Sequence, residues 1–174
     1  MLAKNYDRDY VRITKSFTVE AAKAFQILPP ENEPFNFVFV SGYGATVAPN
    51  RFSAIFARVK GETELELAEM RKANPLLHAV SVRPSFVTAS AHDTIKPYVP
   101  PRTAYEGFVR RLEPGFRNLL PSVWSPTEQL GAFLTGLAMG RYQDQLSPAN
   151  DITFAGSLPI LENTAFRRLM GLKN

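Results

Sequence analysis

Three side chains that could take part in chemistry lie near one another in the first half of the sequence. Ser41 and Tyr43 follow an apolar run, and Lys60 stands four residues after Phe56. On a helix, this i,i+4 spacing places Phe56 and Lys60 side by side. A hydroxyl, a phenol and an amine are groups with which proteins transfer protons or polarise a carbonyl group. These residues therefore indicate a candidate polar site, in which Phe56 is the member that cannot transfer a proton.

Each of these residues also has a purely structural interpretation. Ser41 could be a turn residue whose hydroxyl satisfies backbone groups. Phe56 falls on an apolar helix stripe and could be a plain core residue, and Lys60 beside such a stripe could simply be solvated. The functional interpretation therefore depends on the elements that surround these side chains.

Those elements are predicted to form a strand–helix–strand unit. Residues 35–40 are a short, nearly continuous apolar run, which is typical of a buried parallel strand. Residues 51–73 carry apolar side chains along one side of a helix, and residues 76–83 form the next strand. A crossover of this length joins two parallel strands in a right-handed unit. Ser41 would then lie at the C-terminal end of the first strand.

Residues 9–28 are predicted to form an amphipathic helix. Apolar residues recur there at 3-4-4-3-4 spacing, which puts them on one face. That face consists of Tyr10, Ile13, Phe17, Ala21, Ala24 and Leu28. Asp7 or Asp9 can cap the start of the helix, and the pair Pro29-Pro30 ends it.

Residues 84–125 are rich in proline, serine and threonine, with short helices expected over 104–112 and 115–120. The stretch is too long for a plain connector, so we expect a substrate-facing lid or binding segment. Its aromatic residues suggest an apolar or aromatic small molecule as the substrate. They are Phe86, Tyr98, Tyr105, Phe108, Phe116 and Trp124.

The last part of the chain predicts two helices and a short strand. Ser125 is expected to cap a helix, with Pro126 at its first position and Glu128 completing a capping box. Gly140 ends that helix. A short strand is predicted at 152–154, and a final helix over 163–170 stops at a glycine.

With this order of elements, the chain resembles the catalytic half of the short-chain dehydrogenase/reductase family. The run Phe56-Ala-Arg-Val-Lys60-Gly-Glu62 is similar to the family's Tyr-x-x-x-Lys motif, with Phe56 in place of the tyrosine. Arg83-Pro84-Ser85-Phe86 resembles the strand-end Arg-Pro-Gly segment of the family. The resemblance extends from Asp9 to Leu172 and is closest to atypical, epimerase-like members of fungal type.

The resemblance implies a role for each residue of the candidate site. In this family a serine polarises the substrate carbonyl, and a lysine binds the nicotinamide ribose and keeps the pKa of the catalytic acid low. Ser41 and Lys60 match these positions, and Phe56 stands at the position of the acid. The loss of this catalytic acid would slow the reaction roughly 10²–10⁴-fold. Tyr43, water or the substrate itself could supply the proton instead.

The resemblance also implies a nicotinamide-binding set. The backbone of the strand-end segment would lie against the nicotinamide amide of NAD(P), and Ser85 stands there where the family has glycine. The cofactor-binding residues that the resemblance implies are Ser41, Lys60, Arg83, Pro84, Ser85 and Phe86.

The predicted fold class is α/β, a partial Rossmann-like fold of parallel strands with flanking helices in a single domain over residues 1–174. The first dinucleotide-binding half is missing, because no G-x-G-x-x-G loop occurs. Gly42-Tyr-Gly44 has two of the glycines but follows what resembles the fifth strand. NAD(P) would therefore bind without its usual phosphate-binding loop.

Because the predicted sheet is incomplete, we expect the chain to associate with a protein partner. The strand at 35–40 would be central in a full sheet and becomes an open edge without its neighbour, which favours association. The helices over 9–28 and 51–73 often form a dimer interface in the family. We therefore expect a homodimer through these helices, or another chain that supplies the missing half.

Composition argues against several other classes. The 174 residues are 45% hydrophobic and 21% charged and contain no cysteine, which excludes disulfides and is compatible with a cytoplasmic protein. Two scattered histidines, His78 and His92, do not make a metal site. The net charge of +4 is not clustered, so no nucleic-acid partner is expected. No apolar run reaches the ~20 residues of a membrane span.

Three functions remain open at this point. The first is a truncated or degenerate NAD(P)-dependent oxidoreductase or epimerase-like protein that acts on, or binds, a small apolar metabolite, which would suit specialised-metabolite biosynthesis. The second is a non-catalytic regulatory or scaffold relative that uses the fold for protein interaction. The third is an unrelated α/β binding module. The glutamates Glu62, Glu64, Glu66 and Glu69 are interpreted as a solvated helix face rather than as paired catalytic carboxylates.

Overall fold

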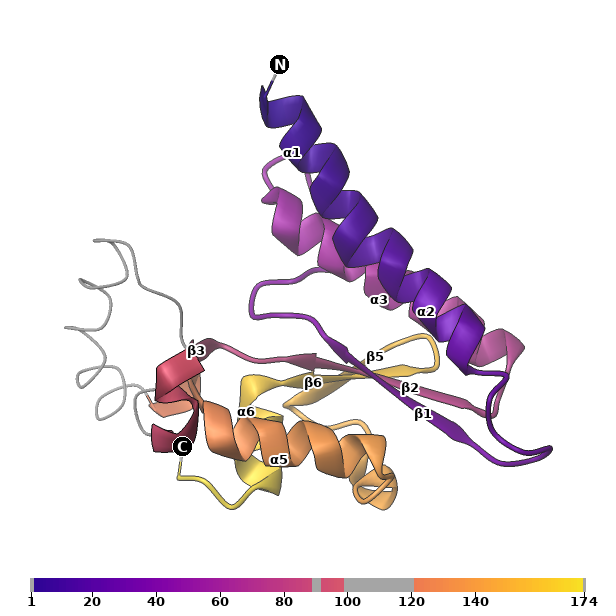
Figure 1. Cartoon of the computed structure of the whole chain (residues 1–174), viewed down its shortest axis with the longest axis vertical. Helices are drawn as coiled ribbons and strands as arrows, with labels where there is room; N and C mark the ends of the chain where they lie inside the picture. The colour runs from indigo at the N-terminus through magenta and orange to yellow at the C-terminus, as the bar shows by residue number, and fades with distance from the viewer. Residues whose placement is uncertain (1, 89–91, 99–120, 174) are drawn as a thin grey trace.

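The computed structural model of the chain describes residues 2–88, 92–98 and 121–173. Within this part, a β-sheet lies between two layers of helices (Figure 1). This mixed α/β architecture of parallel strands and flanking helices agrees with the predicted fold class. The helices expected over 104–112 and 115–120, and the aromatic residues Tyr105, Phe108 and Phe116, lie outside the described residues.

The main sheet has four strands in the order β1 (Phe35–Val40), β2 (Leu77–Arg83), β6 (Leu158–Glu162) and β5 (Ile152–Ala155). The pairs β1–β2 and β2–β6 are parallel, whereas β5 runs antiparallel to β6. Helix α3 (Ile55–Ala73) connects β1 to β2, so the predicted parallel strand–helix–strand unit is confirmed. In the described sheet β1 is an edge, with β2 as its neighbour on one side.

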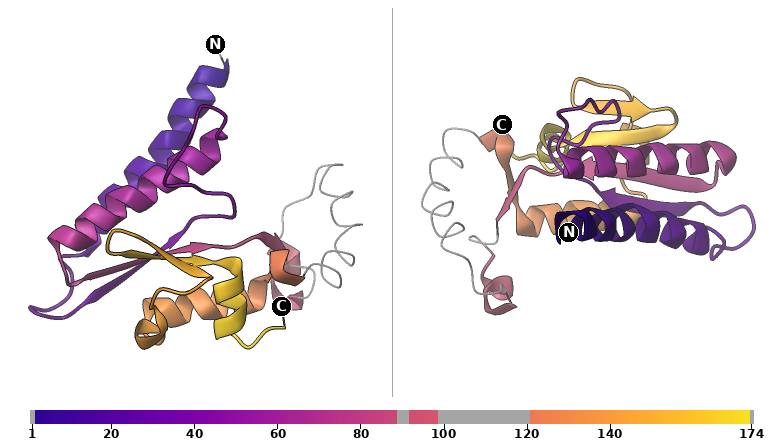
Figure 2. Two further views of the ribbon diagram at one scale, coloured as in Figure 1. Left: turned by 180° about the vertical axis from the view of Figure 1, so that it is seen from behind. Right: turned by 90° about the horizontal axis from the view of Figure 1, so that it is seen from above.

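Helices cover both faces of this sheet. The segments α1 (Leu2–Val11), η1 (Arg12–Ser16) and α2 (Phe17–Phe25) form one rod that lies beside α3 on one face (Figures 1 and 2). On the other face lie α5 (Thr127–Ala138) and α6 (Asn163–Leu169). Short 3₁₀ helices cover Asp93–Tyr98, Pro121–Val123 and Gln143–Gln145.

Alternating side chains of β2 divide the core into two halves. Leu77 and Ala79 belong to the cluster that packs under α2 and α3, whereas Val80 and Val82 belong to the cluster over α5 and α6. Successive side chains of a strand point to opposite faces, so a strand covered on both faces is apolar at nearly every position. This explains the continuous apolar runs of the sequence.

The N-terminal helix differs from the prediction over 9–28 in its bounds and in its buried face. It begins at Leu2, so Asp7 and Asp9 lie inside it rather than capping it. The predicted apolar face is largely exposed: Ile13 and Phe17 are each 57% exposed, while Val19 and Ala22 are buried. The segment η1 is a π turn, which adds a residue to one turn and shifts the periodicity used for the prediction.

Helix α3 starts at Ile55 rather than at residue 51. Asn50 and Ser53 close a turn before it, and the Phe52 N–H donates to Oδ1 of Asn50 at 2.8 Å. The core face is otherwise as predicted, with Val59, Thr63 and Leu67 buried. Phe56, however, is 44% exposed, so its interpretation as a plain core residue is wrong.

The predicted cap of α5 is also wrong. Ser125 is buried in β4 (Trp124–Pro126), which pairs with β3 (Phe86–Thr88) in a separate parallel sheet. Its Oγ donates to Oδ1 of Asn163 at 2.6 Å and is therefore not available to the helix. The end of α5 is as predicted, with Gly140 at a φ of 73°.

Strand β6 was not predicted, although it is an interior strand of the sheet. It contains Pro159, and proline in a run usually argues against a central strand. Pairing with β2 begins only at Ile160, so the missing N–H of Pro159 falls outside that ladder. The strand predicted at 152–154 is confirmed as β5, and the final helix as α6.

None of the helices in the described part of the chain is long and apolar enough to cross a membrane.

Candidate functional site

The candidate site lies where the loop after β1 meets the beginning of α3. Ser41 opens this loop, is 3% exposed, and donates its N–H to the carbonyl of Val82 at 2.8 Å. Lys60 approaches from α3, and its Nζ donates a hydrogen bond to the Ser41 carbonyl oxygen. Two of the predicted site residues are therefore in direct contact.

The Ser41 hydroxyl is buried without a partner. Its Oγ makes no hydrogen bond to any of the residues that the structure describes. Buried polar groups are usually paired, because leaving one unsatisfied costs about 1–3 kcal/mol. The interpretation of this hydroxyl as a group that satisfies turn backbone therefore does not hold. Oγ keeps unused hydrogen-bonding capacity, which a ligand could reach only if the groups that cover it moved.

Close contact between the loop and the helix depends on two glycines. A Cβ on Gly61 would lie 1.8 Å from the carbonyl oxygen of Thr46, and one on Gly42 would lie 3.1 Å from Nζ of Lys60. The Thr46 N–H also donates to the Ala57 carbonyl at 3.1 Å. The loop therefore rests on the helix backbone, and Lys60 reaches it without obstruction.

The environment of Lys60 changes its acidity. Burial lowers the pKa of its amine from the usual value, and the negative charge of Glu64, one turn further along α3, opposes that change. A partly buried amine of this kind differs from a solvated surface lysine, which the sequence had left as an alternative. Perturbed lysines of this kind occur frequently in functional sites.

Phe56 and Tyr43 stand at the border of the same loop. The Tyr43 N–H donates to the Pro84 carbonyl at 2.9 Å, and its side chain is 66% exposed. Cζ of Phe56 lies 3.8 Å from the place that a Cβ on Gly44 would take. Both rings are thus open to solvent next to the loop that Lys60 contacts.

A buried ion pair follows Lys60 by one turn. Glu64 has no exposed surface, and its carboxylate accepts hydrogen bonds from Nε and Nη2 of Arg83 at 3.0 and 2.6 Å. It also accepts one from Oγ of Ser81 at 2.8 Å. Nη1 of Arg83 donates to Glu162 at 2.9 Å. Burial lowers the pKa of Arg83, but the hydrogen bonds and charges of Glu64 and Glu162 outweigh it, and the pKa is raised.

This pair corrects the interpretation of the four glutamates as one solvated face. Glu64 is part of the core, whereas Glu66 and Glu69 are exposed. Glu62 is partly exposed and, like Glu66, lies 3.5 Å from Nζ of Lys15 on the N-terminal helix. The carboxylate that matters for the site is therefore the buried one.

The predicted cofactor segment after β2 is held by the protein itself. The Ser85 N–H lies 3.1 Å from Oγ of Ser125 and 3.4 Å from Oδ1 of Asn163. Pro84 is buried, and Phe86 is partly buried in β3. The Ser85 N–H would have to give up these bonds before it could bind a nicotinamide amide.

The sequence held a signal for Glu64 that was missed. Ala57, Gly61, Glu64 and Ala68 fall on one face of α3 and are all buried. A glutamate on a face of small residues needs a cation, and Arg83 at the end of the next strand offers one. Asn163 was missed as well, because its partners come from distant segments.

The arrangement offers hydrogen-bonding groups rather than a metal site. No group of three or more His, Cys, Asp or Glu residues that could hold a metal occurs within the described ranges. Lys60, which is partly exposed, can donate to a hydroxyl or carbonyl group of a ligand, and the neighbouring aromatic rings can contact its apolar part.

Comparison with known proteins gave one informative relative. No family model matches the chain, and no solved structure matches it. The chain is 41% identical over 156 residues to botcinic acid biosynthesis cluster B protein 16 of Botryotinia fuckeliana (strain B05.10). The alignment covers 88% of this chain and 98% of that protein, so it spans nearly the whole of the relative. The chain therefore belongs to the family of botcinic acid biosynthesis cluster B protein 16.

Proposed function

We propose that the chain is the substrate-side half of an NAD(P)-dependent reductase or epimerase site of the short-chain dehydrogenase/reductase type, acting in specialised-metabolite biosynthesis. The observation that carries the proposal is the hydrogen bond from Nζ of Lys60, an amine of lowered pKa, to the backbone carbonyl of Ser41, whose buried hydroxyl has no partner among the described residues. Both lie at the C-terminal end of a parallel strand, where open α/β sheets bind ligands. The name of the relative supports the metabolic context.

Under this proposal, Lys60 and Ser41 would serve the nicotinamide end of NAD(P). Lys60 would hold the ribose hydroxyls, and Oγ of Ser41 would donate to a carbonyl oxygen of the substrate. A bound nicotinamide supplies or accepts a hydride. The pyrophosphate is not matched, because the sequence has no G-x-G-x-x-G loop. The proposal therefore includes a second chain that contributes the phosphate-binding loop.

The open edge of the sheet supports such a partner. In the described sheet β1 is paired only with β2, and its six residues include no charge and no proline that would discourage further pairing. Ile13 and Phe17 add an exposed apolar stripe on the helix over this face. A second copy could dock through the N-terminal helix and α3, but it has the same sequence and cannot supply the phosphate-binding loop. That loop would have to come from a different chain that supplies the other half of a Rossmann-like sheet.

A second candidate function is a non-catalytic regulatory or scaffold role. It is favoured by Phe56, which cannot replace the tyrosine as a proton donor, and by the Ser85 N–H, which is already bonded to Ser125 and Asn163. In this alternative the fold would serve protein interaction within the same biosynthetic context.

Titration of the purified chain with NADPH and with NADH, followed by nicotinamide fluorescence, separates the two functions. Because the phosphate-binding loop would come from a second chain, the reductase proposal expects weak but saturable binding to this chain alone, and a loss of about tenfold in affinity for Lys60→Met. Lys72→Met is the matched control, because Lys72 is exposed near the other end of α3. A folded chain that binds neither nucleotide would favour the scaffold role.

Restoring the missing phenol tests the register of the motif. Phe56→Tyr should create NADPH consumption with apolar carbonyl compounds if the position is that of the catalytic acid. Unchanged nucleotide binding together with no gain of activity would count against this assignment of Phe56.

A further inference from the structure

The amine of Lys60 differs from those of the other lysines whose side chains the structure describes. Each of the others is either paired with a glutamate or exposed to solvent. They are Lys15, Lys23, Lys72 and Lys173. Lys60 is partly buried, and none of the carboxylates in the described part of the chain forms an ion pair with it. Its amine therefore combines limited solvation with the lack of a neutralising partner.

The contact that Lys60 makes instead is with a neutral group. The carboxylate of Glu64, one turn further along α3, is bound by Arg83 at 3.0 and 2.6 Å. Nζ of Lys60 donates to the backbone carbonyl of Ser41. A carbonyl oxygen accepts a hydrogen from a neutral amine as well as from an ammonium group. The contact therefore orients the amine and leaves the lone pair of its neutral form free to react.

Burial favours that neutral form. It lowers the pKa of Lys60, and the charge of Glu64 opposes this change. At a given pH, a larger fraction of such an amine is neutral than of an exposed lysine, and the neutral amine is the nucleophile. Desolvated lysines of this kind form Schiff bases with carbonyl compounds.

Apolar surface lies next to this amine. Phe56 stands one helical turn before Lys60 on α3 and is 44% exposed. Its ring reaches the loop that Lys60 contacts, because Cζ lies 3.8 Å from the place that a Cβ on Gly44 would take. Tyr43, in the same loop, is 66% exposed. A carbonyl compound with an apolar body can therefore lie on these rings while its carbonyl carbon meets the amine.

We propose that Lys60 is a nucleophilic amine that binds small apolar aldehydes as imines. The nitrogen attacks the carbonyl carbon and forms a C–N bond. The carbonyl oxygen then leaves as water with both amine hydrogens, and a C=N bond remains. A proton from solvent gives the iminium form, whose N–H can still donate to the Ser41 carbonyl. This activity goes beyond the proposed function, because it requires no nucleotide, oxidant or reductant.

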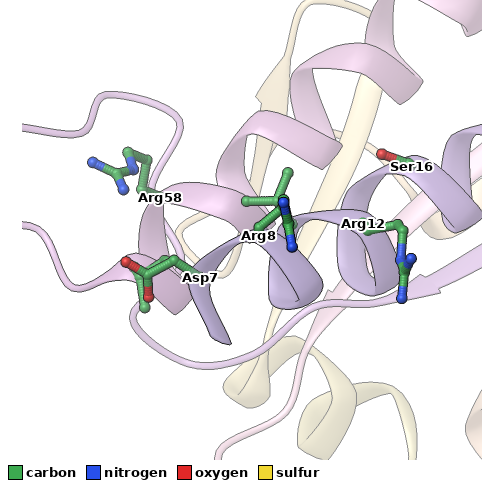
Figure 3. A pocket seen from close by; sticks show the side chains of 7 residues that line it. Asp7, Arg8, Arg12, Ser16 and Arg58 are labelled. Carbon is green, nitrogen blue, oxygen red and sulfur yellow. The ribbon is translucent and has the colours of Figure 1, made fainter. Parts of the chain in front are cut away.

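A cavity between the N-terminal helix and the start of α3 does not compete for the aldehyde. It has a volume of about 420 Å³, and Lys60 is not among its lining residues. Figure 3 shows Arg8 and Arg12 on the N-terminal helix and Arg58 on α3, with the guanidinium groups of Arg12 and Arg58 directed away from each other. Guanidinium groups stay protonated and form no imine under these conditions.

The test is reductive trapping with hexanal. Sodium cyanoborohydride reduces an imine to a stable secondary amine, and peptide mass spectrometry assigns the adduct to individual lysines. Among the lysines, Lys60 should carry most of the label, and its labelling should reach half of its maximum at a lower pH than that of Lys72. Label spread evenly over the lysines, or the same pH dependence at Lys60 and Lys72, would overturn the proposal.

Variants test the amine and the apolar surface separately. Lys60→Arg keeps the charge and should lose the dominant adduct. Phe56→Ser should lower labelling of Lys60 by hexanal about fourfold, the effect of one buried methylene group, but should not change labelling by acetaldehyde, which has almost no apolar body. Phe154→Ser is the matched control, because Phe154 is 38% exposed on β5, at the other edge of the sheet. An equal loss with both aldehydes in Phe56→Ser would contradict the apolar contact.

Labelling in the presence of NADPH separates this activity from the proposed function. Protection of Lys60 by NADPH, with strong labelling in its absence, would support both roles of the amine. Strong labelling that NADPH does not reduce would support the imine and count against ribose binding at Lys60. Saturable NADPH binding without preferential labelling of Lys60 would refute the imine alone.

Discussion

The buried carboxylate of Glu64 is bound by the guanidinium of Arg83 through two hydrogen bonds, of 3.0 and 2.6 Å. Glu64 belongs to α3, the helix that carries Lys60, and Arg83 ends β2, the strand beside β1. Glu162 extends the network to β6. These contacts tie the helix of the candidate site to two strands and hold Lys60 in position beside Ser41.

Removing the charge of Glu64 should therefore be costly. Glu64→Gln leaves the guanidinium of Arg83 largely buried with only the partly exposed Glu162 as an anionic partner. We expect the free energy of unfolding at pH 7 to fall by about 3 kcal/mol, measured by urea denaturation. The reciprocal double variant, Glu64→Gln with Arg83→Met, removes both charges and should recover part of this loss. If the double variant loses as much stability as Glu64→Gln and Arg83→Met lose together when each is made alone, the coupling is contradicted.

Gly61 should be essential for the contact between the loop and α3. In Gly61→Ala the new Cβ would meet the Thr46 carbonyl at 1.8 Å, so the loop must move. We expect a loss of about 1–3 kcal/mol, with weaker ligand binding at Ser41. Gly131→Ala is the control, because a Cβ there meets nothing within 4 Å on the exposed side of α5. It should stabilise the protein by roughly 0.5–1 kcal/mol, since alanine favours helix. Equal effects of the two changes would refute the close contact.

The pair Asp151 and Arg168 should make stability depend on pH. Hydrogen bonds from Arg168, at 2.8 Å each, lower the pKa of Asp151 in the folded protein despite partial burial. A lowered folded pKa stabilises the protein above the unfolded value of about 4, and this contribution is lost as the pH falls through the folded pKa. Arg168→Gln should therefore cost about 0.5–1 kcal/mol at pH 7 and little at pH 2.5. Urea denaturation at both pH values checks this; a difference of the same size at both would contradict it.

The sequence predicted best the elements whose signal is local. The unit of β1, α3 and β2 was found because continuous apolar runs and helical periodicity are visible along the chain. Errors arose where tertiary contacts decide. Ser125 has the pattern of a helix cap, but its hydroxyl is used by Asn163, which lies 38 positions away in the sequence. Interior strand β6 was missed because Pro159 masks it.

The sequence predicted which residues belong to the candidate site, but not which contacts these residues make. The proximity of Ser41 and Lys60 follows from the topology, because a strand end and the helix after it meet in a parallel unit. Whether Arg83 was a cofactor ligand or half of an ion pair could not be decided from spacing, because its partner Glu64 looks like any glutamate of a charged helix. Burial of that carboxylate is a property of the packed structure.

The exposed stripe of the N-terminal helix should mediate self-association. Ile13 and Phe17 are each 57% exposed, and apolar side chains gathered on one helix face usually mark an interface. The double variant Ile13→Glu, Phe17→Glu should remain folded, since these side chains contribute little to the core, but should weaken a dimer at least about tenfold. Sedimentation velocity at micromolar concentration measures both states.

Met139→Glu is the control for this experiment, because Met139 is 60% exposed at the end of α5, on the other face of the sheet. It should leave association unchanged, which separates a specific interface from a general effect of added charge. A wild-type chain that sediments as a compact monomer would exclude a homodimer under these conditions. The open edge of β1 would then have to be covered by a different chain. The same variants would test that contact once the second chain is added, because the exposed stripe and the open edge lie on adjoining elements. Phe25 at the end of α2 and Phe35 at the start of β1 have ring centroids 6.4 Å apart.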